Sequence, residues 1–348
     1  MRYDPEQSYD WNFERGMSLG QHDLEPAAPL PGASWTFCGL PVASPIGIAA
    51  GPLLNGGWVL HYADQGFDIL TYKTVRSRSR SCFQQPNLVP ISESQVVPES
   101  KAHASELMQG SWGISFGMPS RSPNFWRADI ETIKPKLGKG RLLVVSVVAS
   151  PESHWTIDDV ADDYAQCAFW ASESGADVVE LNLSCPNVSS VDGQLYLQPE
   201  LVHKVLERVS DRCPGHPLVI KIGHIHSVSA ISCLIQHCAT LGAAISMTNC
   251  LACTIEDKHG EKLWNGESRG IGGTAIRRES IAQVQRFALQ ARGLKSPPEL
   301  IGIGGVGSWH EVSAYLGAGA TIVQLATAAM LQENLGHQMK RQARESMS

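Results

Sequence analysis

Residues 177–183 read DVVELNL, a run of apolar and β-branched residues that follows a helix-period segment and leads into a turn and another such segment. Runs of this kind, with turns and helix-period segments between them, occur at eight places in the chain. The predicted strands are residues 45–50, 68–74, 142–148, 177–183, 217–222, 244–249, 299–303 and 321–325. The predicted helices include residues 156–175, 199–213, 227–241, 275–293 and 310–318.

Eight strand–helix units predict an α/β fold, a (β/α)8 TIM barrel rather than a doubly wound sheet. Strands that are apolar throughout must be covered on both faces, by helices outside and by packed side chains inside. Functional residues of such barrels lie in the loops that follow the carboxyl ends of the strands. Two connections, residues 75–141 and 251–298, are long enough to form lids or substrate walls on that face. We therefore expect a barrel over residues 35–348, with a substrate-face insertion at 75–141.

The first 34 residues are polar, dotted with aromatic residues and rich in proline toward their end. They predict an N-terminal extension, residues 1–34, that packs on the barrel or on a partner. This segment carries no recognisable chemistry. Its start also lacks the apolar core of a signal peptide.

Composition excludes several classes of protein. The chain has 348 residues, of which 43% are hydrophobic and 18% charged, so it is neither disordered nor a coiled coil. No apolar stretch approaches the roughly 18 to 20 residues of a membrane helix, and a net charge of −6 argues against binding to nucleic acid. Nine cysteines, an odd number, indicate reduced thiols and a cytoplasmic location.

Two short motifs have weak alternative interpretations. Cys250 and Cys253 form a CxxC motif, but no second pair of zinc ligands accompanies it, so we predict no metal site. The basic string SRSRS at residues 77–81 could bind an anion, although a solvated loop is the simpler interpretation.

Glycine-rich turns follow the last strands of the predicted barrel. Residues 302–307 read GIGGVG, residues 269–273 read RGIGG, and Ala326-Thr327 opens a helix after the last strand. Glycine turns let backbone N–H groups approach a phosphate closely, and a helix amino terminus adds partial positive charge. The sequence therefore predicts a phosphorylated ligand at this end of the barrel.

Lysine and asparagine side chains stand at the ends of other strands. Lys73 and Lys221 each end an apolar strand, where an ammonium group without a partner would be costly. Asn182, Asn187 and Asn249 follow two further strands and supply donors and acceptors suited to a planar ligand with amide-like edges. Together with the glycine turns, these residues predict one ligand pocket.

The motifs resemble those of a known family, the FMN-dependent dihydroorotate dehydrogenases, and the related pyrimidine domain of dihydropyrimidine dehydrogenase. Residues 180–187, ELNLSCPN, are similar to the substrate-base segment of the soluble members, which use cysteine where membrane-associated members use serine. The remaining motifs follow in the family's order. They are Ala49-Ala50-Gly51, Lys73-Thr74, Val219-Ile220-Lys221, Asn249, residues 270–273, Gly304-Gly305 and Ala326-Thr327.

The resemblance implies a role for each matching residue, with FMN as the cofactor and no metal. Cys185 would be the catalytic base, and Lys73 would take part beside the flavin. The substrate, a small cyclic amide of the dihydropyrimidine type, would contact Asn182, Asn187, Asn249, Cys250 and Ser115. The cofactor would contact Ala50, Gly51, Lys73, Thr74, Asn182, Lys221, Gly273, Gly304, Gly305, Ala326 and Thr327. The resemblance also implies a homodimer, with a possible electron-transfer partner subunit.

Some positions depart from the family pattern. Ile114 stands where orotate-type members carry an asparagine, and Cys250 stands where serine or threonine is common. Residues 188–192 also differ from the Pro-Gly-Lys of the soluble members. These changes leave the flavin prediction intact and put the identity of the substrate in doubt, dihydroorotate being the family default.

Several alternatives stay open at this point. A dehydrogenase or reductase for dihydrouracil or another cyclic amide fits the same residues. A sugar-phosphate isomerase or aldolase would use the phosphate site but leaves residues 182–187 unexplained. A flavin-binding subunit without turnover would keep the motifs and lose the reaction. The electron acceptor is not indicated by any motif of the chain.

Overall fold

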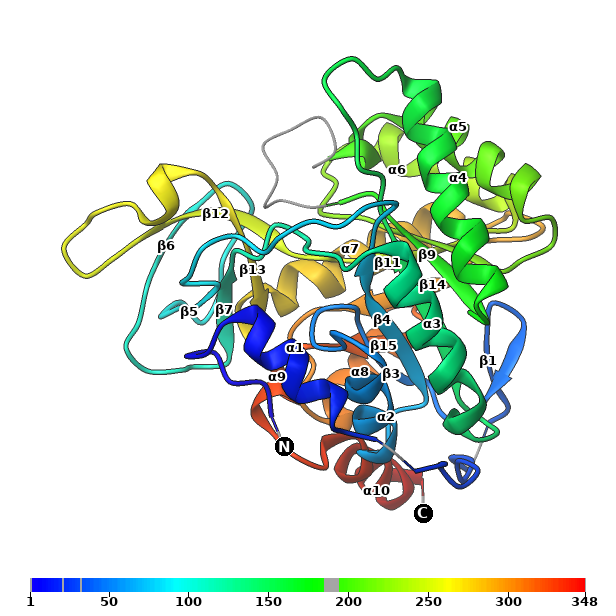
Figure 1. Cartoon of the computed structure of the whole chain (residues 1–348), viewed down its shortest axis with the longest axis horizontal. Coiled ribbons are helices and arrows are strands. Elements are labelled where there is room, and N and C mark those ends of the chain that lie inside the picture. Colours follow the sequence, from blue (N-terminus) through cyan, green and yellow to red (C-terminus); the bar gives the residue numbers. More distant parts are fainter. Residues whose placement is uncertain (1, 21, 32, 185–193, 348) are drawn as a thin grey trace.

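The computed structural model describes residues 2–20, 22–31, 33–184 and 194–347. Eight parallel strands form a closed barrel in which neighbours follow in chain order, so the predicted TIM barrel is confirmed (Figure 1). Each strand lies within one of the eight predicted ranges or extends one residue beyond it. The strands are β3 (Ile46–Ile48), β4 (Ile69–Val75), β8 (Leu142–Val147), β9 (Val178–Asn182), β10 (Leu218–Lys221), β11 (Ala244–Met247), β14 (Leu300–Ile303) and β15 (Ile322–Leu325).

Helices surround this barrel, and the five predicted ones are present. Local sequence explains where they begin and end. The longest helix starts at a capping box, in which the Thr156 hydroxyl and the Asp159 carboxylate each accept from the other's backbone N–H. Another ends at Gly242, whose φ of 67° is left-handed. The helices are α2 (Gly56–Asp64), α3 (Pro123–Ile133), α4 (Ile157–Glu173), α5 (Pro199–Arg212), α6 (Val228–Leu241), α7 (Arg277–Ala291), α8 (Trp309–Gly317), α9 (Thr327–Leu331) and α10 (Leu335–Met347).

The barrel interior holds a packed apolar core. Val144, Val178, Val219 and Ile301, from four different strands, belong to one buried cluster with Phe37. Phe37 lies on an antiparallel hairpin of β1 (Trp35–Phe37) and β2 (Leu40–Val42). The amino-terminal end of the barrel is therefore filled and covered. A cavity lies at the opposite end, at the carboxyl ends of the strands.

A second, five-stranded sheet stands beside the barrel (Figure 1). It is built jointly from the two long connections, 75–141 and 251–298, in the order β5-β7-β13-β12-β6. The prediction of walls on the substrate face did not include this pairing. The strands are β5 (Leu88–Pro90), β6 (Lys101–His103), β7 (Ser111–Ile114), β12 (Leu251–Glu256) and β13 (Arg269–Gly273).

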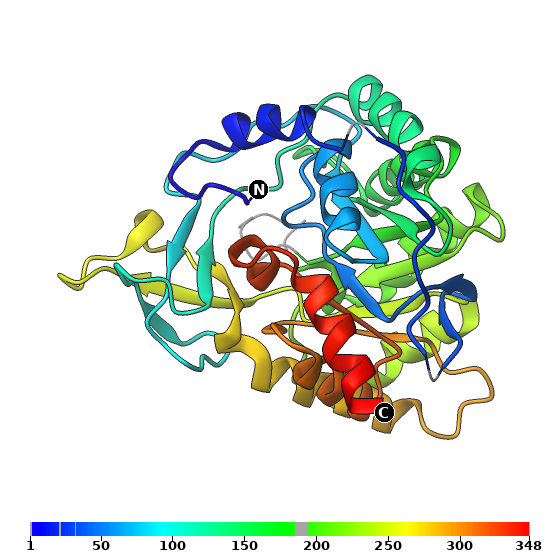
Figure 2. The ribbon, with the colours of Figure 1, turned by 90° about the horizontal axis from the view of Figure 1, so that it is seen from below.

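The first part of the N-terminal segment lies beside the small sheet, whereas its second part runs along the barrel toward the β1–β2 hairpin (Figure 2). Its helix α1 (Tyr9–Met17) begins at Ser8, whose hydroxyl accepts from the Trp11 backbone N–H. Phe13 of this helix packs against Phe125 at 5.5 Å between ring centroids. The segment is therefore attached to the insertion 75–141, and the boundary at residue 34 stays a prediction.

The weak motifs have ordinary structural roles in the part of the chain that is described. Arg78, in the basic string, pairs with Glu152, and the guanidinium of Arg80 lies over the Phe83 ring. The Cys253 thiol donates to the Val97 carbonyl at 3.6 Å. No group of three or more His, Cys, Asp or Glu residues in the described ranges could hold a metal ion. Among those residues, too, no helix is both long and apolar enough to cross a bilayer.

Candidate active site

A cavity of about 240 Å³ opens at the carboxyl ends of the barrel strands, with the small sheet as one of its walls. Thirteen of the sequence-predicted site residues line it. They are Ala50, Gly51, Lys73, Thr74, Asn182, Lys221, Asn249, Cys250, Gly273, Gly304, Gly305, Ala326 and Thr327. Cys185 and Asn187 lie outside the described residues.

One end of the cavity is made of glycine turns. Gly304 and Gly305 have φ values of 125° and 68°, which favour glycine. A Cβ on Gly305 would also lie only 2.5 Å from the Arg277 Cβ. Gly307 differs, since the nearest atom to a Cβ there is the Ala328 Cβ at 3.7 Å. These turns bring main chain to the cavity where side chains would otherwise fill it.

The same end carries positive charge that sequence reasoning missed. Ile276 and Arg277, at the start of helix α7, line the cavity. The Arg277 guanidinium lies 3.0 Å from the Glu311 carboxylate and 3.3 Å from the Gly305 carbonyl. A guanidinium group beside glycine turns of the main chain suits an anionic group. The only sequence signal for Arg277 was its place just after a glycine turn.

The other end of the cavity holds the two lysines. Lys221 is 4% exposed, and its Nζ lies 3.9 Å from Oε1 of the buried Glu180. That oxygen accepts no hydrogen bond within the described residues. Lys73 is 9% exposed. Glu180 therefore balances the charge of Lys221 without covering its ammonium group.

The asparagine side chains are held in place by the protein. Asn249 donates through Nδ2 to both the carbonyl and the hydroxyl of Ser184, at 2.6 and 3.1 Å. Asn182 donates to the Thr74 hydroxyl at 3.2 Å and accepts from the Ser184 N–H at 3.3 Å. Among the described residues, this arrangement leaves Oδ1 of Asn249 available to accept from a ligand.

Ser115 does not line the cavity with the residues named above. Its hydroxyl accepts from Nε of the buried Arg269 at 3.0 Å, and its backbone N–H donates to the Asn87 carbonyl. A substrate contact by Ser115 stays a prediction, but the position of its hydroxyl gives that contact no support.

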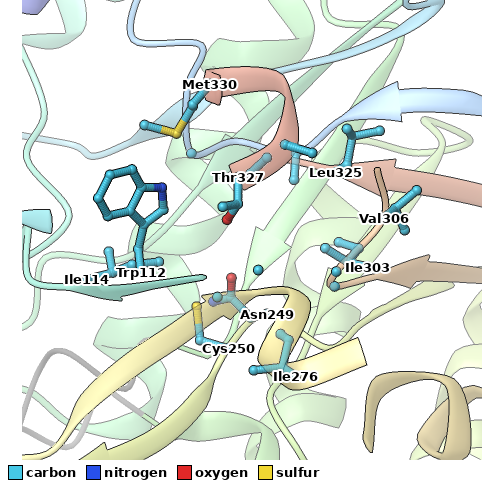
Figure 3. A pocket seen from close by; sticks show the side chains of 18 of the residues that line it. Trp112, Ile114, Asn249, Cys250, Ile276, Ile303, Val306, Leu325, Thr327 and Met330 are labelled. Atoms are coloured by element: carbon cyan, nitrogen blue, oxygen red, sulfur yellow. The ribbon is translucent and has the colours of Figure 1, made fainter. Parts of the chain in front are cut away.

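Apolar and aromatic residues complete the walls, and most of them gave no sequence signal. Trp112 and Met330 lie on one side of the cavity, and Ile303 and Val306 lie on the other (Figure 3). The indole N–H of Trp112 is buried and has no hydrogen-bond partner in the described residues. Tyr3 also lines the cavity, so the N-terminal segment contributes to the site although its sequence showed no chemistry.

Comparison with known proteins identifies the family. The family model described as dihydroorotate dehydrogenase matches residues 129–347. The dihydroorotate dehydrogenase of Dictyostelium discoideum is 30% identical over 94% of this chain and 93% of its own length. A dihydroorotate dehydrogenase (quinone) from Rhodospirillum rubrum is 24% identical over 94% of this chain and 83% of its own length.

A third relative matches about half of the chain. The catalytic subunit of dihydroorotate dehydrogenase B (NAD(+)) from Thermodesulfovibrio yellowstonii is 31% identical over 48% of this chain and 54% of its own length. Among solved structures, the Eimeria tenella enzyme in complex with ferulenol has a TM-score of 0.76 and 17% identity, covering 99% of this chain and 92% of that one. That likeness bears on the fold alone. The chain belongs to the dihydroorotate dehydrogenase family, whose members are oxidoreductases that act on a CH–CH bond.

Proposed function

We propose that this chain binds one FMN in the cavity and oxidises a dihydropyrimidine ring. The observation that carries the proposal is that one cavity is lined both by glycine turns with Arg277 and by two lysines with two asparagines. A phosphorylated planar cofactor and a ring with amide edges need these two kinds of surroundings.

The residues present fit FMN. Gly51 and Gly307 leave room beside the main chain, since a Cβ there would meet only the Ala326 and Ala328 methyl groups, at 3.6 and 3.7 Å. The phosphate would be held by main-chain N–H groups of residues 304–307 and by Arg277. The buried Trp112 N–H offers a donor that the described protein atoms do not use.

Bound FMN would supply the hydride acceptor for one ring carbon of the substrate. Lys73 and Lys221 would place positive charge beside the flavin, which stabilises its reduced, anionic form. Asn249 would orient the ring, because its Oδ1 would accept a hydrogen bond from one of the ring N–H groups.

The proton on the adjacent ring carbon needs a base, and we assign this role to Cys185 from the sequence. Ser184, the residue before it in the sequence, supports the assignment, because its carbonyl accepts from Asn249 at the substrate end of the cavity. A thiol is an effective base only when its thiolate is populated, so a lowered pKa of Cys185 is part of the proposal.

The test starts from the purified protein. Extracted flavin should be FMN at one per chain, and anaerobic mixing with dihydroorotate or dihydrouracil should bleach it. Colourless protein that takes up no FMN would contradict the cofactor assignment. A flavin that only dithionite bleaches would instead indicate a flavin-binding subunit without turnover.

We also propose a cytoplasmic homodimer that passes electrons to a soluble oxidant or a partner subunit. The Thermodesulfovibrio relative is named a catalytic subunit, which supports a partner subunit. Light scattering and co-purification from the source cells test these two assignments.

A further inference from the structure

Three apolar side chains form a wall of the cavity next to Gly272, and we call Leu88, Ile114 and Cys250 the apolar wall. All three line the cavity. Leu88 and Ile114 face each other across the β5–β7 pair. A Cβ on Gly272 would lie 3.1 Å from Cδ1 of Ile114, 3.8 Å from the Thr327 hydroxyl oxygen and 4.0 Å from Sγ of Cys250, so the Ile114 and Cys250 side chains lie close together with one hydroxyl beside them.

Two polar groups of the cavity lie near this wall, the Thr327 hydroxyl and the Trp112 N–H, and the proposal assigns both to FMN. The other polar neighbours, Ser115 and Arg269, are directed elsewhere. Ser115 follows Ile114, so its side chain points to the opposite face, where Arg269 donates to its hydroxyl. Arg269 also donates to the Ser268 carbonyl and to the Glu267 carboxylate, at 3.1 and 2.7 Å. Neither Ser115 nor Arg269 is available to a ligand that touches Ile114.

The cavity asparagines do not compensate for the wall. Both hydrogens of the Asn249 amide are directed to Ser184, and the Asn182 amide donates to Thr74. A thiol such as Cys250 is a weak donor. Apart from Lys73 and Lys221, which the proposal places beside the flavin, the described side chains at this end therefore offer an acceptor at Oδ1 of Asn249 rather than donors for a second amide carbonyl.

We infer, on the basis of the proposed function, that the substrate presents a hydrocarbon edge to the apolar wall. The preferred substrate is a dihydropyrimidine or related cyclic amide with a methyl or methylene group at that edge, in place of a polar group. A polar edge left unpaired against the wall would weaken binding by roughly tenfold to a hundredfold. One added methyl in a fitting apolar site would raise kcat/KM by about tenfold or more.

A methyl scan of the substrate tests the inference with the purified flavin-bound protein. Flavin bleaching is measured with dihydroorotate, with dihydrouracil and with dihydrouracil methylated at each ring position in turn. The expected result is at least one methylated isomer with a kcat/KM about tenfold above that of both unmethylated rings. The Kd of the matching oxidised rings, measured from the change they cause in the flavin spectrum, should follow the same order.

Variants link the preference to the wall. Ile114→Asn should abolish the advantage of the favoured methyl group and improve the binding of orotate. Leu107→Asn is the matched control, because Leu107 lies in the same insertion and is 73% exposed, and it should leave the order of substrates unchanged. Flavin content and melting temperature show whether Ile114→Asn has folded, and the substrate scan on the unaltered protein does not depend on any variant.

Two failures have different meanings. If unmethylated rings bleach the flavin faster than every methylated isomer, the inference is overturned and the proposed function stands. If no ring bleaches the flavin, the proposed function fails, and the inference that rests on it fails as well.

Discussion

Glu180 and Lys221 show how a single buried pair can prepare the site. Glu180 is 1% exposed, and the carboxylate oxygen nearest Lys221 accepts no hydrogen bond from the described residues. A carboxylate in this position is tolerated because the ammonium of Lys221 lies 3.9 Å away. The pair keeps a positive charge at the cavity that a ligand can still approach.

We predict that Glu180→Gln lowers the free energy of unfolding by about 3–5 kcal/mol, since it leaves the Lys221 charge buried without its partner. Asp158→Asn is the matched control, because Asp158 pairs with Lys204 on the surface, with side chains 54% and 39% exposed. That change should cost less than about 1 kcal/mol. Urea unfolding without added flavin measures both, and equal effects would contradict the assigned role of Glu180.

The proposed base gives a second prediction at this scale. Cys185→Ala should retain FMN and slow substrate-driven flavin reduction by about 10²-fold or more, the usual scale for a general base. Cys185→Ser should retain a little activity, shifted to higher pH. Stopped-flow reduction under anaerobic conditions gives the rates, and a wild-type rate in Cys185→Ala would leave this thiol without a catalytic role.

At the scale of elements, Gly307 allows a cleaner test of the phosphate site than Gly305, although both lie in the turn between β14 and α8. Gly305 has a left-handed φ, and a Cβ there would press on Arg277, so any substitution strains the backbone. Gly307 has neither problem, because its nearest neighbour would lie 3.7 Å away.

Gly307→Asp should therefore fold normally and lose FMN, because the new carboxylate would repel the phosphate. We expect at least a hundredfold weaker FMN binding, with an unchanged melting temperature for the flavin-free protein. Titration with FMN, with Gly307→Ala as control, measures the change. Unaltered affinity in Gly307→Asp would place the phosphate elsewhere.

The loop after β10 contains a histidine that is kept neutral. Burial, the Arg286 guanidinium and the His226 ring lower the pKa of His224 to about 4. Between that value and the unfolded pKa of about 6.5, the unfolded chain binds more protons, so stability rises with pH across this window. His224→Gln should flatten the dependence of the unfolding free energy on pH from about 4 to 6.5.

His154→Gln is the control for this prediction, because the His154 side chain is 74% exposed. It should leave the slope as it is in the wild type. Chemical unfolding at a series of pH values provides the measurement. An unchanged slope in His224→Gln would show that another group controls acid sensitivity.

The barrel strands could be predicted from the sequence, whereas the small sheet and part of the cavity could not. The barrel strands were predictable because each is an apolar run that must be buried on both faces, as in β4 and β8. The small sheet was not, because its strands are short and β7 pairs with β13 across more than a hundred residues of chain. Glycine turns and lysines at strand ends predicted most of the cavity, whereas Trp112 and Tyr3 reach it only through long-range packing.

In the whole molecule, three separate parts of the chain close the cavity around the barrel. Insertion 75–141 and connection 251–298 form the small sheet, and the first residues of the N-terminal segment lie at the remaining side (Figure 2). Arg2 donates to the Leu331 carbonyl at 2.6 Å. Tyr3 meets Phe116 edge to face, with ring centroids 6.2 Å apart. The first residues of the described chain are thus fixed beside the site.

This arrangement predicts that the N-terminal segment slows the release of the flavin. Tyr3 is 6% exposed and lines the cavity. Removing a buried aromatic side chain from the wall of a ligand site costs about 1.5–3 kcal/mol of binding free energy. This corresponds to roughly tenfold to a hundredfold in affinity. In Tyr3→Ala this loss should appear mainly as faster dissociation of FMN. Tyr3→Phe keeps the ring, so FMN should dissociate from it at the wild-type rate.

The same variants separate a local effect from a loss of folding. Saturating FMN at about a hundred times its Kd stabilises the folded protein by about 2.7 kcal/mol. At that fixed concentration, a tenfold weaker Kd in Tyr3→Ala reduces the increment to about 1.4 kcal/mol. Melting curves with and without FMN measure the increment, and flavin dilution measures the dissociation rate. A full increment and an unchanged rate in Tyr3→Ala would mean that the segment covers the cavity without holding its contents.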